Sequence, residues 1–465
     1  IDPATRQVTS ADSILIPAAE VAQCGADPAT QAIVDKAEAD SKEAGKRVVA
    51  TGYTQPFRRG VFTTPAGATE PGSNRGIESS LGDLVADSLR EMILTPDGKS
   101  VDIGMINAGD LRADLVPNED GTITYAQTYE VEPFSNQLGY VTLKGSDLKD
   151  ALEQQWKTDL NSQNSRPMLK LSLSSNVRYT YDSARPYGER ITSVTINGEP
   201  LKADGTYTVG SVNFLLDGGD SFEALTRGGA AILNGNLDRD SINAYLARHS
   251  GVADRAAGAA SGLTPREAKS SIGLTLPTEA VADGSTVTIP LRGLSFSEGP
   301  SITRKVRVSA GGPEAVADVD NSLVDAHASD AAAVITTDGA GQASVDVTVV
   351  GACEGKAAGE VVNVALTVAT DFATVVEATD GLTIPVTCAG TEVPVPAPSP
   401  SANADQGAAP GAGAPASTKK PNAGAPRGAI ARTGADSRGL PVAFLLAVVG
   451  VAALWLRRSQ IVTSR

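Results

Sequence analysis

The hydrophobic pattern of this chain changes between residues 255 and 268, and the change separates two fold classes. Residues 48–255 alternate short apolar strands with amphipathic helices, which is typical of an α/β domain with a mixed sheet. Residues 268–390 instead place apolar side chains at every second position, between turns rich in Gly and Asp. This second pattern predicts an all-β, Ig-like sandwich.

The elements of the first region can be placed from the same pattern. We expect helices over 78–93, 145–156 and 237–248, and strands over 101–106, 137–143, 177–181, 191–196 and 206–212. Asn197-Gly198 is a strong hairpin signal. Nearer the N-terminus, Asp27 is a good N-cap and Pro28 a good first residue for a helix that runs to about Lys46. We interpret residues 1–47 as a connector-helix region that leaves an earlier element.

Net charge and histidine content limit which partners and metal sites this chain can have. The 465 residues include 39 Lys and Arg against 54 Asp and Glu, a net charge of -15, which argues against DNA or RNA as the main partner. The two histidines, His249 and His327, lack a second His or Cys at ligand spacing. We therefore expect no metal site in this chain and interpret both histidines as structural.

Three cysteines indicate the redox compartment. Cys353 and Cys388 both fall in the predicted sandwich, and strand parity places each on the inward face. They suit a single disulfide, which favours an oxidising compartment. Cys24 is left over, either as a free thiol or with a partner upstream of Ile1.

The C-terminal region has a three-part order. Residues 391–429, rich in Pro, Ala and Gly, predict a disordered spacer, and 430–465 hold Ile430-Ala-Arg-Thr-Gly434, an uncharged run over 440–456 and Arg457-Arg458. This order resembles the LPxTG or LAxTG cell-wall sorting signals of Gram-positive bacteria, with Ile430 in place of Leu. The resemblance implies a transmembrane helix over 440–456, sortase cleavage between Thr433 and Gly434, peptidoglycan as the final partner, and an extracellular location. The alternative is a single-pass anchor with a chance motif.

Three short segments combine Gly or Pro with side chains suited to a ligand: Asn107-Ala-Gly-Asp-Leu-Arg112, Pro133-Phe-Ser-Asn136 and Asn213-Phe-Leu-Leu-Asp-Gly-Gly-Asp220. We expect each to follow a strand. Arginine offers a planar fork for phosphate, aromatic rings can sandwich a base, and a carboxylate accepts hydroxyl hydrogen bonds. The set predicts a nucleotide pocket. The alternative for each Phe is a packing plug.

The same segments resemble motifs of the 5'-nucleotidase family, which includes bacterial UDP-sugar hydrolase. Glu78-Ser-Ser-Leu-Gly-Asp-Leu84 corresponds to E-S-x-L-G-N-L, and the three segments correspond to N-G-G-G-I-R, P-F-G-N and N-F-L-x-x-G-G-D-G-F. The resemblance covers about residues 50–250 and implies the C-terminal, substrate-binding domain of that family. Ala108 and Asp110 depart from it, since both replace glycines of the phosphate loop, and Asp110 adds a negative charge beside Arg112.

The resemblance also implies a role for each site residue. Phe134 and Phe214 would stack the base, and Asp220 would accept the ribose hydroxyls. The phosphate oxygens would meet Arg75 and Arg112. The set is completed by three residues that would also contact substrate: Asn107, Gly109 and Asn136.

In the family, water attacks a phosphoester at a pair of divalent metals (Zn, Mn or similar) held by a separate N-terminal metallophosphatase domain. That domain does not occur in this sequence, so the resemblance implies that this chain binds an AMP-like or UDP-sugar-like nucleotide but does not hydrolyse it alone. The chain is interpreted as the substrate-binding part of a cell-surface 5'-nucleotidase acting in extracellular nucleotide catabolism. The alternative is a non-enzymatic, wall-anchored adhesin or spacer with a decayed nucleotidase fold.

Overall fold

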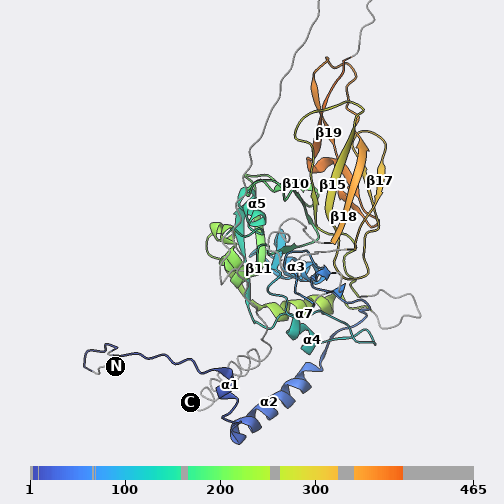
Figure 1. Cartoon of the computed structure of the whole chain (residues 1–465). Coiled ribbons are helices and arrows are strands. Elements are labelled where there is room, and N and C mark those ends of the chain that lie inside the picture. The colour runs from blue at the N-terminus through green and yellow to red at the C-terminus, as the bar shows by residue number, and fades with distance from the viewer. Residues whose placement is uncertain are drawn as a thin grey trace, which may run out of the picture. The chain divides into compact units, whose positions relative to one another are not determined.

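Five strands form the mixed sheet of the first region, in the order β12–β6–β11–β4–β7. The central strand of this sheet, β11, is labelled in Figure 1. β4 and β11 run parallel, and the other neighbouring pairs are antiparallel. The strands are β4 (Ile103–Asn107), β6 (Gln137–Lys144), β7 (Leu171–Leu173), β11 (Thr206–Val212) and β12 (Ile232–Leu237). All five residues of β4 are buried, as an apolar strand at the centre of a sheet requires.

The register of this sheet brings the three ligand segments to one edge. β4 ends at Asn107, and the parallel β11 ends at Val212, directly before Asn213. β6 runs the opposite way and begins at Gln137, with Leu138 paired to Val212. Carboxyl ends of parallel strands and the amino end of an antiparallel neighbour lie at the same edge. The segments that follow β4 and β11 and precede β6 therefore meet there.

Most predicted elements of this region are confirmed, and two expectations are wrong. Pro133–Asn136 does not follow a strand, because the preceding element is the helix α4 (Tyr125–Val131), capped by a reciprocal pair of Thr124 and Gln127 bonds. The helix expected over 145–156 ends earlier, since α5 spans Gly145–Glu153. Trp156 instead forms a bridge with Met168, and its ring is fully buried.

The helices show why the amphipathic pattern was informative. α3 (Ser80–Met92) begins where the Ser79 side chain accepts a hydrogen bond from the Gly82 amide, and it packs against β4, β7 and β11. α7 (Asp238–Arg248) buries the apolar side chains of Ile242, Tyr245 and Leu246. The remaining elements of this region are β1 (Val48–Ala50), β2 (Thr63–Thr64), β3 (Gly67–Ala68), β5 (Ile123–Thr124), β8 (Val177–Tyr181), β9 (Ile191–Ile196), β10 (Glu199–Pro200), α6 (Asn213–Leu216), η1 (Gly219–Ser221) and η2 (Glu223–Gly228).

A computed structural model describes residues 4–8, 10–64, 67–68, 70–158, 166–251, 262–322 and 340–390. Residues 40–392 form one unit, and residues 1–39 belong to another. The N-terminal residues include α1 (Ala18–Val21) and α2 (Pro28–Gly45), where Asp27 accepts a hydrogen bond from the Thr30 amide as an N-cap does. No helix among the described residues is long and apolar enough to cross a membrane. The predicted spacer, sorting motif and span over 391–465 lie outside them.

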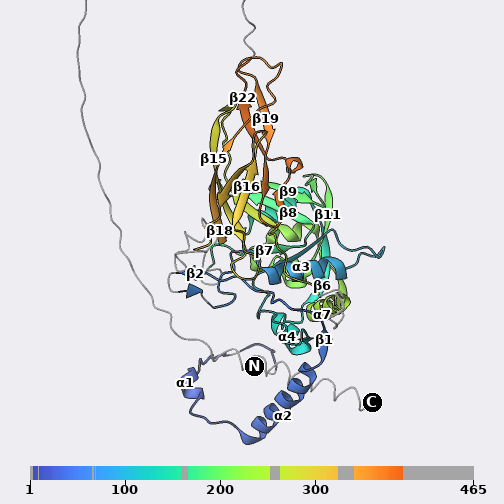
Figure 2. The same cartoon turned by 90° about the vertical axis from the view of Figure 1, so that its right-hand side faces the viewer.

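The two regions share a sheet. Its order is β10–β9–β8–β13–β15–β18, so β8 of the α/β region pairs in parallel with β13 (Ser271–Leu274) of the following region. Figure 2 shows β8 and β9 beside the strands of that region. Hydrogen bonding therefore continues across the boundary that the change in periodicity predicts.

The second region packs its strands around a core of its own. The alternation seen in the sequence appears as burial, because Ile289, Leu291, Val345, Val347, Val364, Val368, Ile384 and Val386 are all buried. Cys353 and Cys388 form a disulfide. The elements are β13, β14 (Val281–Ala282), β15 (Thr286–Ser295), β16 (Lys305–Ser309), β17 (Ala315–Asp318), β18 (Ala340–Thr348), β19 (Val361–Ala365), β20 (Thr367–Ala369), β21 (Thr374–Val376), η4 (Ala378–Asp380) and β22 (Thr383–Thr387).

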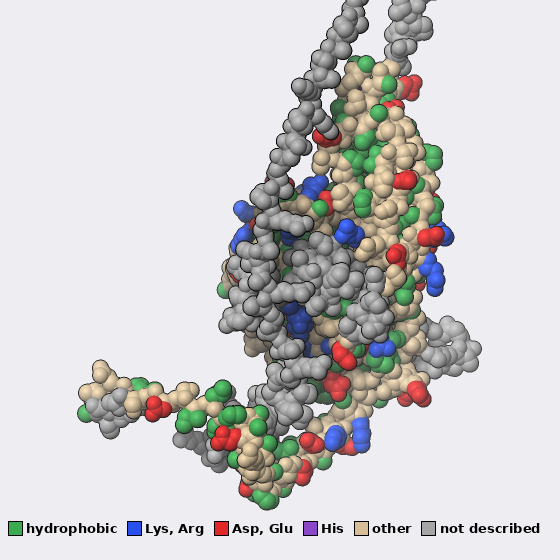
Figure 3. Space-filling model, viewed as in Figure 1, with side chains coloured by type: hydrophobic (Ala, Val, Ile, Leu, Met, Phe, Trp, Pro, Cys, Tyr) green, Lys and Arg blue, Asp and Glu red, His purple; other side chains and the backbone are tan. Residues whose placement is uncertain are grey.

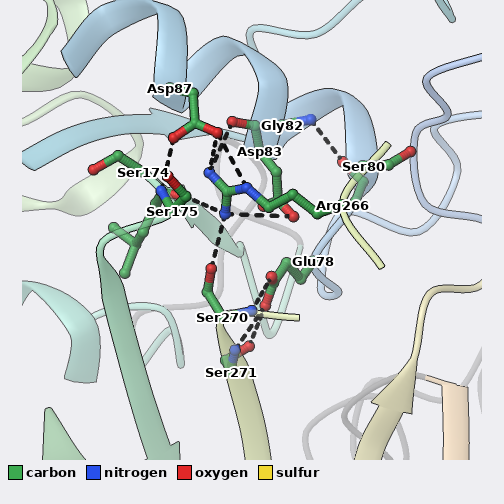
Figure 4. A network of polar contacts seen from close by, with 12 residues as sticks. Glu78, Ser80, Gly82, Asp83, Asp87, Ser174, Ser175, Arg266, Ser270 and Ser271 are labelled. Atoms are coloured by element: carbon green, nitrogen blue, oxygen red, sulfur yellow. Dashed lines mark hydrogen bonds and ion pairs between the residues drawn. The ribbon is translucent and has the colours of Figure 1, made fainter. Parts of the chain in front are cut away.

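A buried polar network reinforces this junction (Figure 4). The Glu78 carboxylate accepts hydrogen bonds from the Ser270 amide over 2.6 Å and the Ser271 amide over 3.0 Å, and it also accepts one from the Ser271 hydroxyl. Arg266 forms an ion pair of 2.6 Å with Asp87 of α3 and lies 3.8 Å from Asp83. The Glu78–Leu84 motif thus contacts the segment that leads into the second region.

Candidate functional site

Four of the predicted site residues converge at the edge of the five-stranded sheet. The Asn107 amide nitrogen, at the end of β4, donates to Asp220 Oδ2 over 2.7 Å. Gly109 lies against both: a Cβ atom placed on it would stand 3.1 Å from Asn107 Nδ2, 3.1 Å from Asp220 Oδ2 and 3.3 Å from an Arg75 guanidinium nitrogen. A glycine here lets the backbone lie close to an amide, a carboxylate and a guanidinium.

Arg112 connects this cluster to the first aromatic ring. Its guanidinium donates to the Gly109 carbonyl over 3.2 Å and lies 5.6 Å from the centre of the Phe134 ring. The Arg59 guanidinium donates to the Arg112 carbonyl over 2.7 Å, and Arg59 pairs with Asp114 at 2.9 Å. These bonds fix the backbone that presents Arg112 at the sheet edge.

Both phenylalanines expose much of their rings. Phe134 is 49% exposed and Phe214 is 44% exposed, so neither plugs the hydrophobic core. Phe214 rests against the Gly219 backbone, where a Cβ atom would come within 2.6 Å of two ring carbons. An exposed ring seated on a fixed backbone offers a flat face to a planar ligand.

Hydrogen bonds tie the two aromatic segments together. Asn213 Oδ1 accepts from the Gln137 amide over 2.9 Å, which joins the start of β6 to the residue before Phe214. Asn136 is held on the other side: its amide donates to Asp238 Oδ2 over 2.8 Å, and its carbonyl accepts from the Asp238 amide over 3.0 Å. These two bonds attach the segment that contains Phe134 to the first residue of α7.

The loops of the site contain left-handed backbone at non-glycine residues. Ser135 has φ of 59°, and the consecutive Asp220 and Ser221 have φ of 53° and 57°. Such conformations cost free energy and persist only where surrounding contacts hold them. Lys157 supplies one of these contacts, because its Nζ donates to the Ser221 carbonyl over 3.3 Å and lies 3.5 Å from the centre of the Phe222 ring.

Several cationic groups lie near the cluster. Burial lowers the pKa of Arg75 to about 10, and the neighbouring Arg166 and Arg112 contribute to this lowering while Asp220 opposes them. Burial also lowers the pKa of Lys157 to about 8, again against the carboxylate of Asp220. Arg75 stays charged at neutral pH, so it repels the neighbouring arginines. A bound anion would reduce this repulsion.

Buried acidic groups also lie at this sheet edge. Burial, with Asp238 and Asp220 nearby, raises the pKa of Asp110 to about 7. Glu132, which directly follows α4, is 1% exposed, and burial raises the pKa of its carboxyl well above the usual range. Burial raises the pKa of Asp238 as well. No local sequence signal points to Glu132, Asp238 or Lys157, because each of them has polar or charged neighbours that lie far away in the sequence.

The residues that the structure describes show no set of side chains arranged to bind a metal ion. Among the described residues, no group of three or more His, Cys, Asp or Glu side chains is arranged to hold a metal ion. His249 follows α7 and contacts Glu91 at 3.1 Å, and His327 lies outside the described residues. On the face seen in Figure 3, Lys and Arg side chains are interspersed with Asp and Glu.

Comparison with known proteins identifies the region that holds the cluster. Residues 60–227 match the family described as "5'-nucleotidase, C-terminal domain". This region is similar to that domain. The matched region contains Arg75, Asn107, Arg112 and Asp220, and its mixed α/β fold agrees with the expectation from sequence.

Relatives of this domain occur in proteins of different kinds. The chain is 34% identical over 156 residues to the cell wall protein Lmo0130 of Listeria monocytogenes, which covers 32% of this chain and 19% of that protein. It is 26% identical over 183 residues to the 5'-nucleotidase of Homo sapiens, covering 37% and 31%. A 5'-nucleotidase precursor from Thermus thermophilus aligns in structure with a TM-score of 0.38 and 27% identity, covering 51% of this chain and 42% of that one. The chain spans less than half the length of each of these proteins.

Proposed function

We propose that the 5'-nucleotidase C-terminal domain of this chain holds the nucleotide substrate of a phosphoester hydrolase. The observation that supports this proposal best is the convergence of Asn107, Asp220 and Arg75 around Gly109 at one sheet edge. A carboxylate that can accept hydrogen bonds from hydroxyl groups lies there, beside guanidinium groups that can bind phosphate. Two exposed aromatic rings lie on the adjoining loops. The family match supports the same chemistry.

Each group has a role in this proposal. Phe134 and Phe214 stack the base, Asp220 accepts the ribose hydroxyls, and Arg75 and Arg112 contact the phosphate. Asn107 Oδ1 is buried and has no hydrogen-bond partner among the described residues, so it is suited to accept a bond from a ligand hydroxyl or amine. The proposal assigns no metal ligand and no bond-breaking step to this chain.

Binding of a nucleotide to the full chain tests the proposal. AMP, ADP and a UDP-sugar are titrated by calorimetry, and at least one is expected to bind and to raise the melting temperature. Phe134→Ala combined with Phe214→Ala is expected to abolish both effects. Tyr187→Ala is the matched control, because Tyr187 is also about half exposed, at 45%, and lies in the turn between β8 and β9. No binding at millimolar nucleotide contradicts the proposal and favours an adhesin or spacer.

We also propose an extracellular, wall-attached location. The similarity to a cell wall protein supports it, as does the Cys353–Cys388 disulfide, since disulfides persist in oxidising compartments. In this proposal, sortase cleaves between Thr433 and Gly434 and joins the protein to peptidoglycan. Thr433→Ala is expected to move the protein from the wall to the membrane fraction, and unchanged wall attachment contradicts the proposal.

A further inference from the structure

We infer that Asp110 is a specificity-determining residue, which must take up a proton before a phosphate group can bind beside Arg112. The pocket therefore selects between a nucleoside and its phosphate ester according to pH. This inference rests on the proposed nucleotide-binding function. It concerns a position where the family motif has glycine, so this carboxylate is a feature of this chain and not of the motif.

Asp110 is held inside the ligand loop and does not extend into solvent. Its residue is 4% exposed, and its amide donates to the Asn107 carbonyl over 3.2 Å. One carboxylate oxygen accepts from Asn136 Nδ2 at 3.3 Å. The other, Oδ2, is buried without a hydrogen-bond partner among the described residues. A buried, ionised carboxylate with one unsatisfied oxygen is costly, whereas the protonated acid is less so.

The charges that face Asp110 are mostly negative. Asp238 approaches from the start of α7, Asp220 from η1, and Glu132 from the end of α4. Arg112 of the same loop opposes them, and the Asn136 amide also favours the ionised form. Glu132 Oε1 is likewise buried without a hydrogen-bond partner in the described part of the chain. Burial and the neighbouring carboxylates outweigh Arg112, which places the pKa of Asp110 at about 7.

A bound phosphate would shift this balance further. A phosphate monoester carries about −1.5 to −2 charges near pH 7. Placed against Arg112, it adds negative charge next to Asp110 and raises the pKa of that carboxyl, so binding draws in one proton from solvent. By linkage, affinity for the ester then falls as pH rises above about 7, by up to about tenfold per pH unit. An uncharged nucleoside lacks this coupling.

The test compares AMP with adenosine on the full chain, by calorimetry from about pH 6 to pH 9. For the wild type, the affinity for AMP is expected to fall at least about tenfold between pH 6.5 and pH 8.5, while the affinity for adenosine stays level. In two buffers of different ionisation enthalpy, AMP binding at about pH 7.5 is expected to show proton uptake.

The matched variants are Asp110→Asn and Asp204→Asn. Asp110→Asn keeps the shape and an oxygen for Asn136 but removes the charge, so the ratio of AMP to adenosine affinity at pH 8.5 is expected to rise about tenfold and its pH dependence to flatten. Asp204, exposed in the turn before β11, is a control whose replacement leaves the wild-type pH dependence unchanged. Asp110→Gly gives a second neutral variant if the asparagine variant does not fold.

The outcomes separate the inference from the function beneath it. If neither ligand binds at any pH, the proposed function fails. If AMP binds without proton uptake in the wild type, or with the same pH dependence in Asp110→Asn, the inference is overturned and the proposed function stands. The wild-type buffer comparison alone decides the inference if both neutral variants fail to fold.

Discussion

Asn107 Nδ2 donates to Asp220 Oδ2 over 2.7 Å, between residues separated by 113 positions in the sequence. The bond joins the end of β4 to the left-handed turn at η1, and it orients a carboxylate that the sequence alone could only place in a loop. Two distant chain segments are thus joined by one polar contact at the sheet edge that carries the proposed site.

This contact predicts a measurable coupling. Asn107→Leu and Asp220→Leu are each expected to lower the free energy of unfolding, because each leaves the partner unpaired, and the double variant is expected to lose less than the sum. The coupling should be about 1–3 kcal/mol. Urea unfolding of the four proteins measures it. Additive losses would show that the bond contributes nothing specific.

The seat of the second aromatic ring gives a second prediction. A Cβ atom on Gly219 would lie 2.6 Å from the Phe214 ring and 2.5 Å from the Phe214 carbonyl oxygen. Gly219→Ala is therefore expected to cost about 1–3 kcal/mol of stability and to lower AMP affinity at least tenfold. Phe214→Ala is the comparison: it should lower affinity with little effect on stability, because its ring is 44% exposed. Normal AMP affinity in Gly219→Ala argues against a stacking role for Phe214.

Lys157 predicts a pH-dependent contribution to stability. Burial lowers its pKa to about 8 in the folded protein, below its ordinary value of 10.5. The folded state therefore binds fewer protons than the unfolded state between those values, and stability rises with pH across that window. Relative to Lys157→Met, the wild type should gain about 1–3 kcal/mol between pH 8 and pH 10.5. Urea unfolding at several pH values measures the difference, and a constant difference contradicts the assignment.

How much the sequence predicts depends on whether a feature is local. The period of two in β15, β18 and β22 and the amphipathic pattern of α3 are local, and both appear as burial in the structure. The ligand segments were also locatable, since turn residues flank their binding side chains. Glu132, Lys157 and Asp238 were not, because their importance comes from neighbours distant in sequence. The helix before Pro133 was missed because a seven-residue helix has too few turns to show a period.

The polar junction between the regions gives a fourth prediction. Glu78, 2% exposed, accepts three hydrogen bonds from Ser270 and Ser271. Glu78→Gln keeps the shape of the side chain but removes its charge. It also replaces one accepting oxygen by an NH₂ group, which cannot accept a hydrogen bond from the serines. The free energy of unfolding should therefore fall by about 1–3 kcal/mol. Glu119→Gln, at an exposed loop position, is the control. Unfolding by urea measures both, and equal stability of the two variants would show that the junction does not depend on this carboxylate.

The pairing of β8 with β13 also bears on how the protein is made. Tyr179 lies opposite Ser271, so the six-stranded sheet cannot close until the later strand has left the ribosome. Until then, β8 has an open edge in the place that β13 will fill, and long-range pairings of this kind form slowly. The nascent α/β region therefore cannot complete this sheet until β13 is available. The interval in which its open edge can pair with another chain begins when β8 emerges and ends when β13 pairs with it.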